Sequence, residues 1–270
     1  MGNLVVVGVD GSSESLAAVD EAAREAWRRR AELRVVYAFD GPARPLYAPL
    51  DPAPLRDLVK EAARRAKSVA PQLEVSEAVM TGEVAAVLEA ESRTADLLVV
   101  GSHGTGGFIG MLVGSKAVTL AAYGHCPVMV VRGEEPDPAR PVVLAVDGSP
   151  MGEKAVDFAF AEASLRGAEL VGVHAWLPDY APPGTGTESA ERLLAQALVG
   201  HAEQYPDVMV RHDVISGEVR EVLIETSRTA QLMVVGARGR GGFLGLLLGS
   251  VSQALLHHAH SPVAVVRGKD

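Results

Sequence analysis

The chain has 270 residues, of which 48% are hydrophobic and 22% charged, a globular composition with room for two domains of ordinary size. Its formal net charge of -9 argues against a dedicated DNA or RNA binder, whose surface is usually basic. The one cysteine, Cys126, excludes an intramolecular disulfide, and no apolar stretch reaches the roughly 18 residues of a membrane helix. We therefore expect a cytoplasmic protein whose partners include neither nucleic acid nor a membrane.

Apolar runs alternate with amphipathic segments through the first half. Residues 4–9 form a continuous apolar run, which predicts a strand buried on both faces, and Ser12 or Ser13 can cap the helix that follows to about residue 30. Further strands are predicted at residues 33–39, 73–80, 96–100 and 128–131, and further helices at residues 55–69, 83–91 and 115–123. This alternation predicts an α/β domain with a mostly parallel sheet and helices on both faces.

The second half repeats these landmarks in order, at an offset of about 135 to 137 residues. Val-Asp-Gly-Ser at residues 9–12 recurs at 146–149, and Ser-Arg-Thr-Ala at residues 92–95 recurs at 227–230. We therefore predict a tandem duplication, with domains at residues 1–133 and 141–270. The linker is expected at residues 134–140, which are rich in proline and acidic side chains.

A glycine pattern follows the fourth predicted strand of each half. It consists of Gly101, Gly104 and Gly114-Ser115 in the first half, and of Gly236, Gly239 and Gly249-Ser250 in the second. A strand that runs through glycines into a helix aims backbone amides at phosphate. Neither copy is a Walker A loop, and neither is the Rossmann fingerprint, which follows the first strand of its fold.

Asp10 and Asp147 end the first predicted strand of each half. With a strand order of 3-2-1-4-5, the first and fourth strands flank the point where the order reverses, and ligands bind there in open α/β sheets. Asp10 can contact ribose hydroxyls or a metal held by phosphates, or it can form an Asx turn or a helix cap. Ser115 can likewise donate to a phosphate or cap its own helix. The residues leave these alternatives open.

The glycine pattern, the Val-Asp-Gly-Ser start and the Pro-Val-x-Val-Val end of each half together resemble the universal stress protein family in its tandem form. The pattern matches that family's ATP-binding signature, Gly-x2-Gly-x9-Gly-Ser/Thr, in both halves. The resemblance implies two Rossmann-like open-sheet domains, each a five-stranded parallel sheet of order 3-2-1-4-5. It also implies ATP binding, a regulatory or stress-response role and a homodimer of tandem chains.

The resemblance also implies the residues that contact ATP. In the first half these are Gly8, Asp10, Val36, Gly101, Ser102, His103, Gly104, Thr105, Gly106, Gly107, Gly114, Ser115 and Lys116. In the second half they are Asp147, Val173, Gly236, Ala237, Arg238, Gly239, Arg240, Gly241, Gly242, Gly249, Ser250 and Val251. No metal site of protein side chains alone is expected, although Mg bound with ATP can lie near Asp10 and Asp147.

Charges near the glycines differ between the halves. Arg238 and Arg240 stand where the first half has His103 and Thr105, so we expect two sites of unequal affinity. No motif places a nucleophile or a base, so the leading hypothesis is a binding protein with at most slow ATP hydrolysis. The alternatives are a nucleotide-dependent enzyme and a protein–protein interaction module that nucleotide stabilises.

Overall fold

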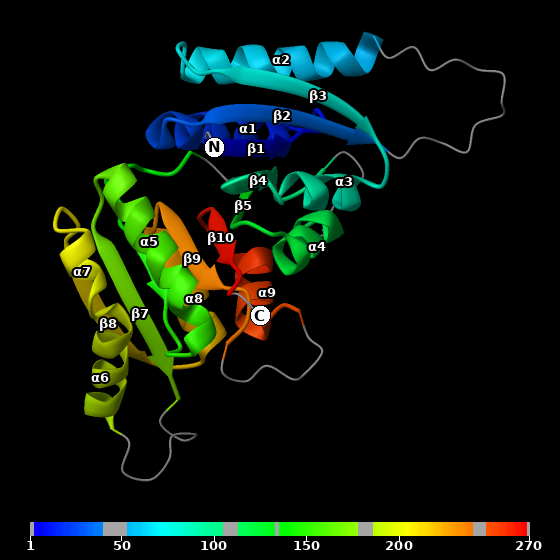
Figure 1. The fold of residues 1–270 in the computed structure, drawn as a ribbon. Helices are drawn as coiled ribbons and strands as arrows, with labels where there is room; N and C mark the ends of the chain where they lie inside the picture. The colour runs from blue at the N-terminus through cyan, green and yellow to red at the C-terminus, as the bar shows by residue number, and fades with distance from the viewer. Residues whose placement is uncertain are drawn as a thin grey trace. The chain divides into compact units, whose positions relative to one another are not determined.

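The computed structural model in Figure 1 describes residues 3–39, 53–104, 113–132, 135–177, 186–239 and 247–268. The chain divides into two compact units, Met1–Arg132 and Gly133–Asp270. Each unit is an α/β fold with its own parallel sheet, and the two are described in turn. The exact limits of the linker stay a prediction.

Five strands form the sheet of the first unit, in the order β3-β2-β1-β4-β5 with every neighbouring pair parallel. Its elements are β1 (Leu4–Gly8), α1 (Ser13–Arg29), β2 (Glu32–Phe39), α2 (Ala53–Val69), β3 (Val75–Thr81), α3 (Val84–Glu91), β4 (Leu97–Gly101), α4 (Ser115–Tyr123) and β5 (Val128–Val131). Helices α1 and α2 pack together, as do α3 and α4, on opposite faces of the sheet (Figure 1). The predicted fold class and strand order are therefore confirmed.

The second unit has the same sheet order, β8-β7-β6-β9-β10, again with parallel neighbours. Its elements are β6 (Val142–Ala145), η1 (Pro150–Gly152), α5 (Glu153–Arg166), β7 (Leu170–Trp176), α6 (Thr187–Leu198), α7 (His201–Gln204), β8 (Val210–Ser216), α8 (Val219–Thr226), η3 (Ser227–Thr229), β9 (Leu232–Gly236), α9 (Ser250–His258) and β10 (Val263–Val266).

The central strands of both units are apolar throughout because helices cover both faces of each sheet. Val5, Val6 and Val7 of β1 are fully buried, and so are Leu232 and Met233 of β9. The packed core therefore fixes the positions of the carboxyl ends of the central strands. The loops that follow these ends begin from fixed positions.

One helix departs from the expected repetition. The 17-residue helix α2 is continuous, whereas the corresponding segment of the second unit divides into the 12-residue α6 and the 4-residue α7. The break lies at Val199 and Gly200, and Gly200 has a φ of 88°, a conformation that favours glycine and ends a helix. The expectation that the second half repeats every helix of the first is wrong here.

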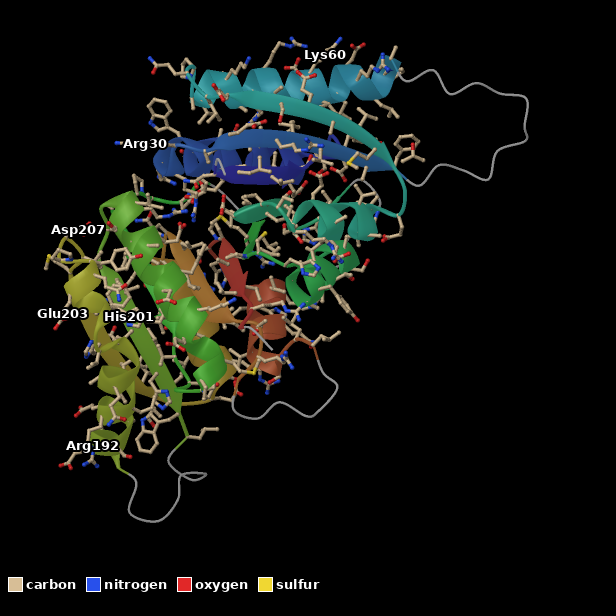
Figure 2. The ribbon with its side chains drawn as sticks, in the orientation of Figure 1. Arg30, Lys60, Arg192, His201, Glu203 and Asp207 are labelled. Carbon is tan, nitrogen blue, oxygen red and sulfur yellow. The ribbon has the colours of Figure 1, made fainter. Side chains whose placement is uncertain are left out.

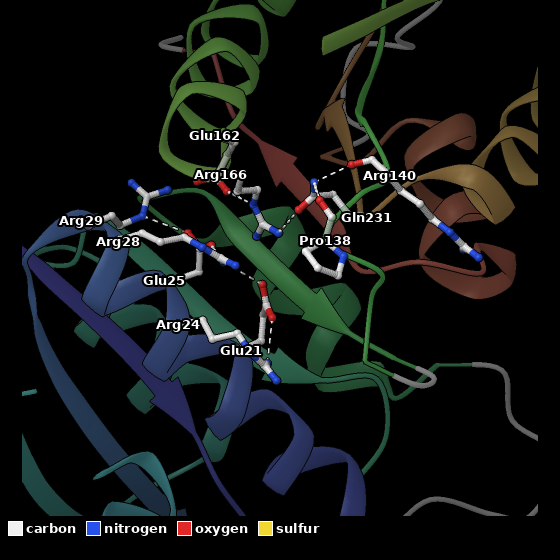
Figure 3. Close-up of polar contacts among 10 residues, drawn as sticks. All are labelled: Glu21, Arg24, Glu25, Arg28, Arg29, Pro138, Arg140, Glu162, Arg166 and Gln231. Atoms are coloured by element: carbon white, nitrogen blue, oxygen red, sulfur yellow. Dashed lines mark hydrogen bonds and ion pairs between the residues drawn. The ribbon is translucent and has the colours of Figure 1, made fainter. Parts of the chain in front are cut away.

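Buried carboxylates on the first helix of each unit are paired within that helix (Figure 3). Glu25 of α1 accepts from Nη1 of Arg28 at 2.8 Å and from Nε of Arg29 at 3.1 Å. In α5, Glu162 accepts from Nε of Arg166 at 2.9 Å. Burying a carboxylate without such a partner would reduce the stability of the fold by several kcal/mol. The i,i+3 and i,i+4 pairs offset this penalty for Glu25 and Glu162.

Candidate functional site

A carboxylate forms an Asx turn at the end of the first strand in each unit. Oδ1 of Asp10 accepts from the backbone N–H of Ser12 at 3.0 Å and from its hydroxyl at 2.6 Å. Oδ1 of Asp147 accepts from the backbone N–H of Ser149 at 2.9 Å. Ser12 then caps α1 by accepting from the backbone N–H of Ser15 at 3.1 Å. Each turn thus fixes its carboxylate at the carboxyl edge of the sheet.

The other oxygen of each carboxylate lies against a glycine of the loop after the fourth strand. A methyl group placed on Gly104 would overlap Oδ2 of Asp10, and one placed on Gly239 would overlap Oδ2 of Asp147. The structure therefore brings Asp10 to Gly104 and Asp147 to Gly239, at the sheet edge where the strand order predicts a crevice. Any side chain at these two glycines would displace the carboxylate.

The entrance and exit of each glycine loop are tied together by one backbone hydrogen bond. The N–H of Gly114 donates to the carbonyl of Ser102 at 2.7 Å, and the N–H of Gly249 donates to the carbonyl of Ala237 at 2.7 Å. The fourth strand and the following helix are thereby held at the same point. Thr105, Gly106, Gly107, Arg240, Gly241 and Gly242 lie outside the described residues.

Helices α4 and α9 begin at this point without a side-chain cap. Their N-cap residues are Gly114 and Gly249, so the alternative in which Ser115 caps its own helix is wrong. Ser115 and Ser250 are instead the first helical residues, and both are exposed. A first turn without a side-chain cap offers its N–H groups to water or to an anion, which the positive end of the helix dipole favours.

The remaining predicted residues of the first unit lie around this loop. A methyl group on Gly101 would come within 2.8 Å of the carbonyl oxygen of Glu14, so this glycine lets β4 end against α1. Ser102 and His103 are joined by a 3.0 Å hydrogen bond between Oγ and Nδ1. Gly8 pairs with Val36 across β1 and β2 at the same edge of the sheet.

Lys116 is exposed on α4 and acts on a neighbouring carboxylate. Backbone hydrogen bonds from Ala85 and Ala86 lower the pKa of Glu83, and the charge of Lys116 lowers it further. Lys116 therefore lies close to Glu83 at the start of α3.

A cavity of about 880 Å³ opens at the carboxyl ends of β6, β7 and β9 in the second unit. This volume lies in the range of pockets that take a ligand of nucleotide size. Eight predicted site residues line it, namely Asp147, Val173, Gly236, Arg238, Gly239, Gly249, Ser250 and Val251. Ala145, which stands where the first unit has Gly8, lines it as well.

The prediction missed the side of the cavity that the helices form. Glu153 and Val156 of α5, Leu193 and Ala197 of α6, His201 of α7 and Leu223 of α8 also line it. These residues carry no motif. The sequence signal that could have found them is Gly200, which interrupts a helix that is continuous in the first unit.

Among the described residues, no cluster of three or more His, Cys, Asp or Glu side chains could hold a metal ion. No helix in these parts of the chain is both long and apolar enough to cross a membrane. Cys126 is buried, and burial raises the pKa of its thiol to about 12, so the thiol stays protonated and unreactive at neutral pH.

The model of the universal stress protein family matches residues 1–132 and again residues 138–267. The chain belongs to this family, as a tandem universal stress protein. It is 38% identical to a universal stress protein of Mycolicibacterium smegmatis over 284 residues, which covers 97% of this chain and 96% of that one. It is 39% identical to universal stress protein Rv2005c of Mycobacterium tuberculosis over 289 residues, with the same coverage.

Solved structures show the same fold. A universal stress protein from Archaeoglobus fulgidus superposes with a TM-score of 0.70 and 19% identity, and the match covers 99% of this chain and 97% of that chain. A putative universal stress protein from Pseudomonas aeruginosa gives a TM-score of 0.67 at 20% identity. At these identities the likeness concerns the fold alone.

Proposed function

We propose that each half of this tandem universal stress protein binds ATP at the carboxyl edge of its sheet, and that the protein acts through this binding. The observation that carries the proposal is the contact between Asp147 and Gly239 inside a cavity that Gly249 and Ser250 also line. The same contact between Asp10 and Gly104 supports the equivalent site in the first half.

The chemistry of the cavity suits a nucleoside phosphate. Backbone N–H groups at the start of α9 and the guanidinium of Arg238 favour anionic phosphates, while Val173 and Leu223 offer apolar contact for a base. Asp147 lies between these two regions, where it can accept from ribose hydroxyls or help to hold Mg bound with the phosphates. The cavity therefore suits a nucleotide, which has anionic phosphates at one end and an apolar base at the other.

The two sites are expected to differ in affinity. Arg238 is a permanent cation in the second loop, whereas His103 at the equivalent position of the first loop is hydrogen-bonded to Ser102. We therefore propose tighter phosphate binding in the second half. The stress-response role, the cytoplasmic location and the homodimer stay predictions.

Titration calorimetry with MgATP, combined with native mass spectrometry, tests the proposal. The wild-type chain should bind two nucleotides, and Gly104→Ala or Gly239→Ala should each bind one, because the new methyl group displaces the carboxylate of Asp10 or Asp147. The loss at the altered half should exceed tenfold in Kd. Gly186→Ala is the matched control, since no atom of the described residues lies within 4 Å of the added carbon.

Two results would count against this assignment. Both glycine variants could keep two nucleotides per chain, which would place binding elsewhere. Alternatively, the wild-type chain could bind no ATP at millimolar concentration, which would remove the nucleotide from the function.

A further inference from the structure

The first two helices of each half pack differently, and in the first half they are closed onto each other. Cδ1 of Leu58 on α2 lies 3.0 Å from where a side-chain carbon on Gly11 would stand, so α2 covers the turn after β1. Ala62 and Ala66 of α2 are buried. Small side chains allow two helices to approach closely, which leaves little room between α1 and α2.

The second half has a large aromatic cluster at the equivalent place. Phe160 of α5, fully buried, stands where α1 has Ala23. Its ring stacks on His201 with centroids 5.2 Å apart and on Tyr205 with centroids 5.8 Å apart. Nε2 of His201 also contacts Oδ1 of Asp157 at 2.8 Å, which ties α7 to α5 (Figure 2 labels His201). The stacking and the hydrogen bond together hold α7 against α5.

The space between α5 and α6 is part of the cavity described above. Val156 of α5 faces it, and so do Leu193 and Ala197 of α6, while Gly239 and Ser250 line the same cavity at its other end. The compartment between the helices is called the α5–α6 groove here, defined by Val156, Leu193, Ala197, Val199 and His201. Val156, Leu193, Ala197 and Val199 make it apolar, while Glu153 of α5, Gln196 of α6 and His201 of α7 line the same cavity with polar side chains.

The order of the strands indicates which end of a bound nucleotide, the phosphates or the base, would face this groove. The glycine loop follows β9, Asp147 follows β6, and Val173 lies in β7, so these three features stand in line along the sheet edge. Helix α6 packs on β7 and β8. With its phosphates at the loop and its ribose at Asp147, a nucleotide points its base at Val173 and toward the groove.

We propose that the α5–α6 groove is a subsite for an apolar substituent on the base, so that the second half, and not the first, accepts N6-substituted adenine nucleotides. This inference rests on the proposed function. The exocyclic amine lies at the end of the purine far from the ribose, so a group attached there enters the groove directly. Burying an apolar group against Val156, Leu193 and Ala197 strengthens binding in proportion to the area removed from water.

The probe for this subsite is N6-benzyl-ATP, titrated into the full chain beside ATP. We expect ATP to bind at two sites and N6-benzyl-ATP at one, with a Kd no more than about threefold weaker than that of ATP at the same half. Gly104→Ala should keep the N6-benzyl-ATP site, and Gly239→Ala should lose it.

Filling the groove separates the subsite from the nucleotide site. Ala197→Phe should weaken N6-benzyl-ATP at least ten times more than it weakens ATP, and Ala197→Ser, a much smaller change, should weaken N6-benzyl-ATP less than Ala197→Phe does. ATP binding reports in the same titration that the variant is folded, and Ala197→Leu supplies a narrower block if Ala197→Phe is unfolded.

Three outcomes would overturn the inference alone: ATP binds but N6-benzyl-ATP does not, N6-benzyl-ATP binds both halves, or its binding is indifferent to the filled groove. Absence of ATP binding itself would instead reject the proposed function, and the subsite with it.

Discussion

The two halves of the chain share a sheet order, a glycine loop and an aspartate, yet they differ in the helices beside the site. Asp10 and Asp147 meet their glycines in the same way, and both loops are closed by the same 2.7 Å backbone hydrogen bond. The helix that follows the second strand is continuous as α2 and broken between α6 and α7. The two halves thus share the contact between aspartate and glycine and the closed loop, and they differ in the helices beside it.

A second comparison concerns the ion pair between the two helices. Asp20 of α1 is paired with Arg65, through Nε at 2.7 Å and Nη2 at 2.5 Å, whereas the equivalent Asp157 of α5 is paired with His201. The guanidinium fork makes two parallel hydrogen bonds, and the imidazole makes one and offers a flat ring for stacking on Phe160. In the second half one imidazole thus joins the contact with Asp157 to the stacking on Phe160.

The largest expected effect comes from removing that cluster. Phe160→Ala should lower the free energy of unfolding of the second half by about 3–5 kcal/mol, because the ring is fully buried and its loss leaves a cavity. Urea unfolding followed by Trp176 fluorescence, in a Trp27→Phe background, measures the second half separately.

A matched change in the first half checks this assignment. Leu33→Ala removes a fully buried side chain of β2 and should cost about 2–5 kcal/mol there, reported by Trp27 in a Trp176→Phe background. If Phe160→Ala changed both transitions equally, the two halves would not be separate units of stability.

A smaller effect is expected from exchanging Cys126 and Ser261, which precede β5 and β10 at equivalent positions. Both are buried, and Oγ of Ser261 has no hydrogen-bond partner among the described residues. A buried hydroxyl without a partner costs about 1–3 kcal/mol, so Ser261→Cys should stabilise the second half and Cys126→Ser should destabilise the first. Thermal or urea unfolding of the two variants measures the change in the free energy of unfolding. The change should be positive for Ser261→Cys and negative for Cys126→Ser.

The thiol adds a pH dependence to this exchange. Burial raises the pKa of Cys126 to about 12 in the folded state, against about 8.5 for an exposed thiol. The unfolded state therefore loses its proton first, and the wild-type chain should lose stability as the pH rises above about 8.5. Cys126→Ser should lose less over that range.

Much of this architecture can be predicted from the sequence, because it depends on patterns within short segments. The apolar run of Val5, Val6 and Val7 predicts a strand that is buried on both faces. Gly104 and Gly239 predict positions where another group lies too close for a side chain. The α5–α6 groove was out of reach because it depends on contacts between distant residues. Phe160 meets His201 across 41 positions of the chain, and neither residue belongs to a motif.

The smallest expected effect concerns the acidic caps of α3 and α8. Glu83 accepts from the backbone N–H groups of Ala85 at 3.0 Å and Ala86 at 2.7 Å, and Glu218 caps α8 in the same way. Replacing either glutamate by alanine should cost about 1 kcal/mol. Because the folded-state pKa of Glu83 is lowered, its contribution is present above the unfolded pKa of about 4.3 and is lost as the pH falls through the folded value.

Lys116 makes this cap differ between the halves. The backbone hydrogen bonds from Ala85 and Ala86 lower the pKa of Glu83 most, and Lys116 adds to them, whereas the second half has Val251 at the equivalent position. Lys116→Ala should therefore reduce the cost of Glu83→Ala in a double-mutant cycle by a few tenths of a kcal/mol, since both groups are exposed. The coupling should vanish at about 1 M salt, where exposed charges are screened within ~3 Å. A coupling that persists at high salt would mean that Lys116 acts on α3 through packing, and the two caps would then differ in shape and not in charge.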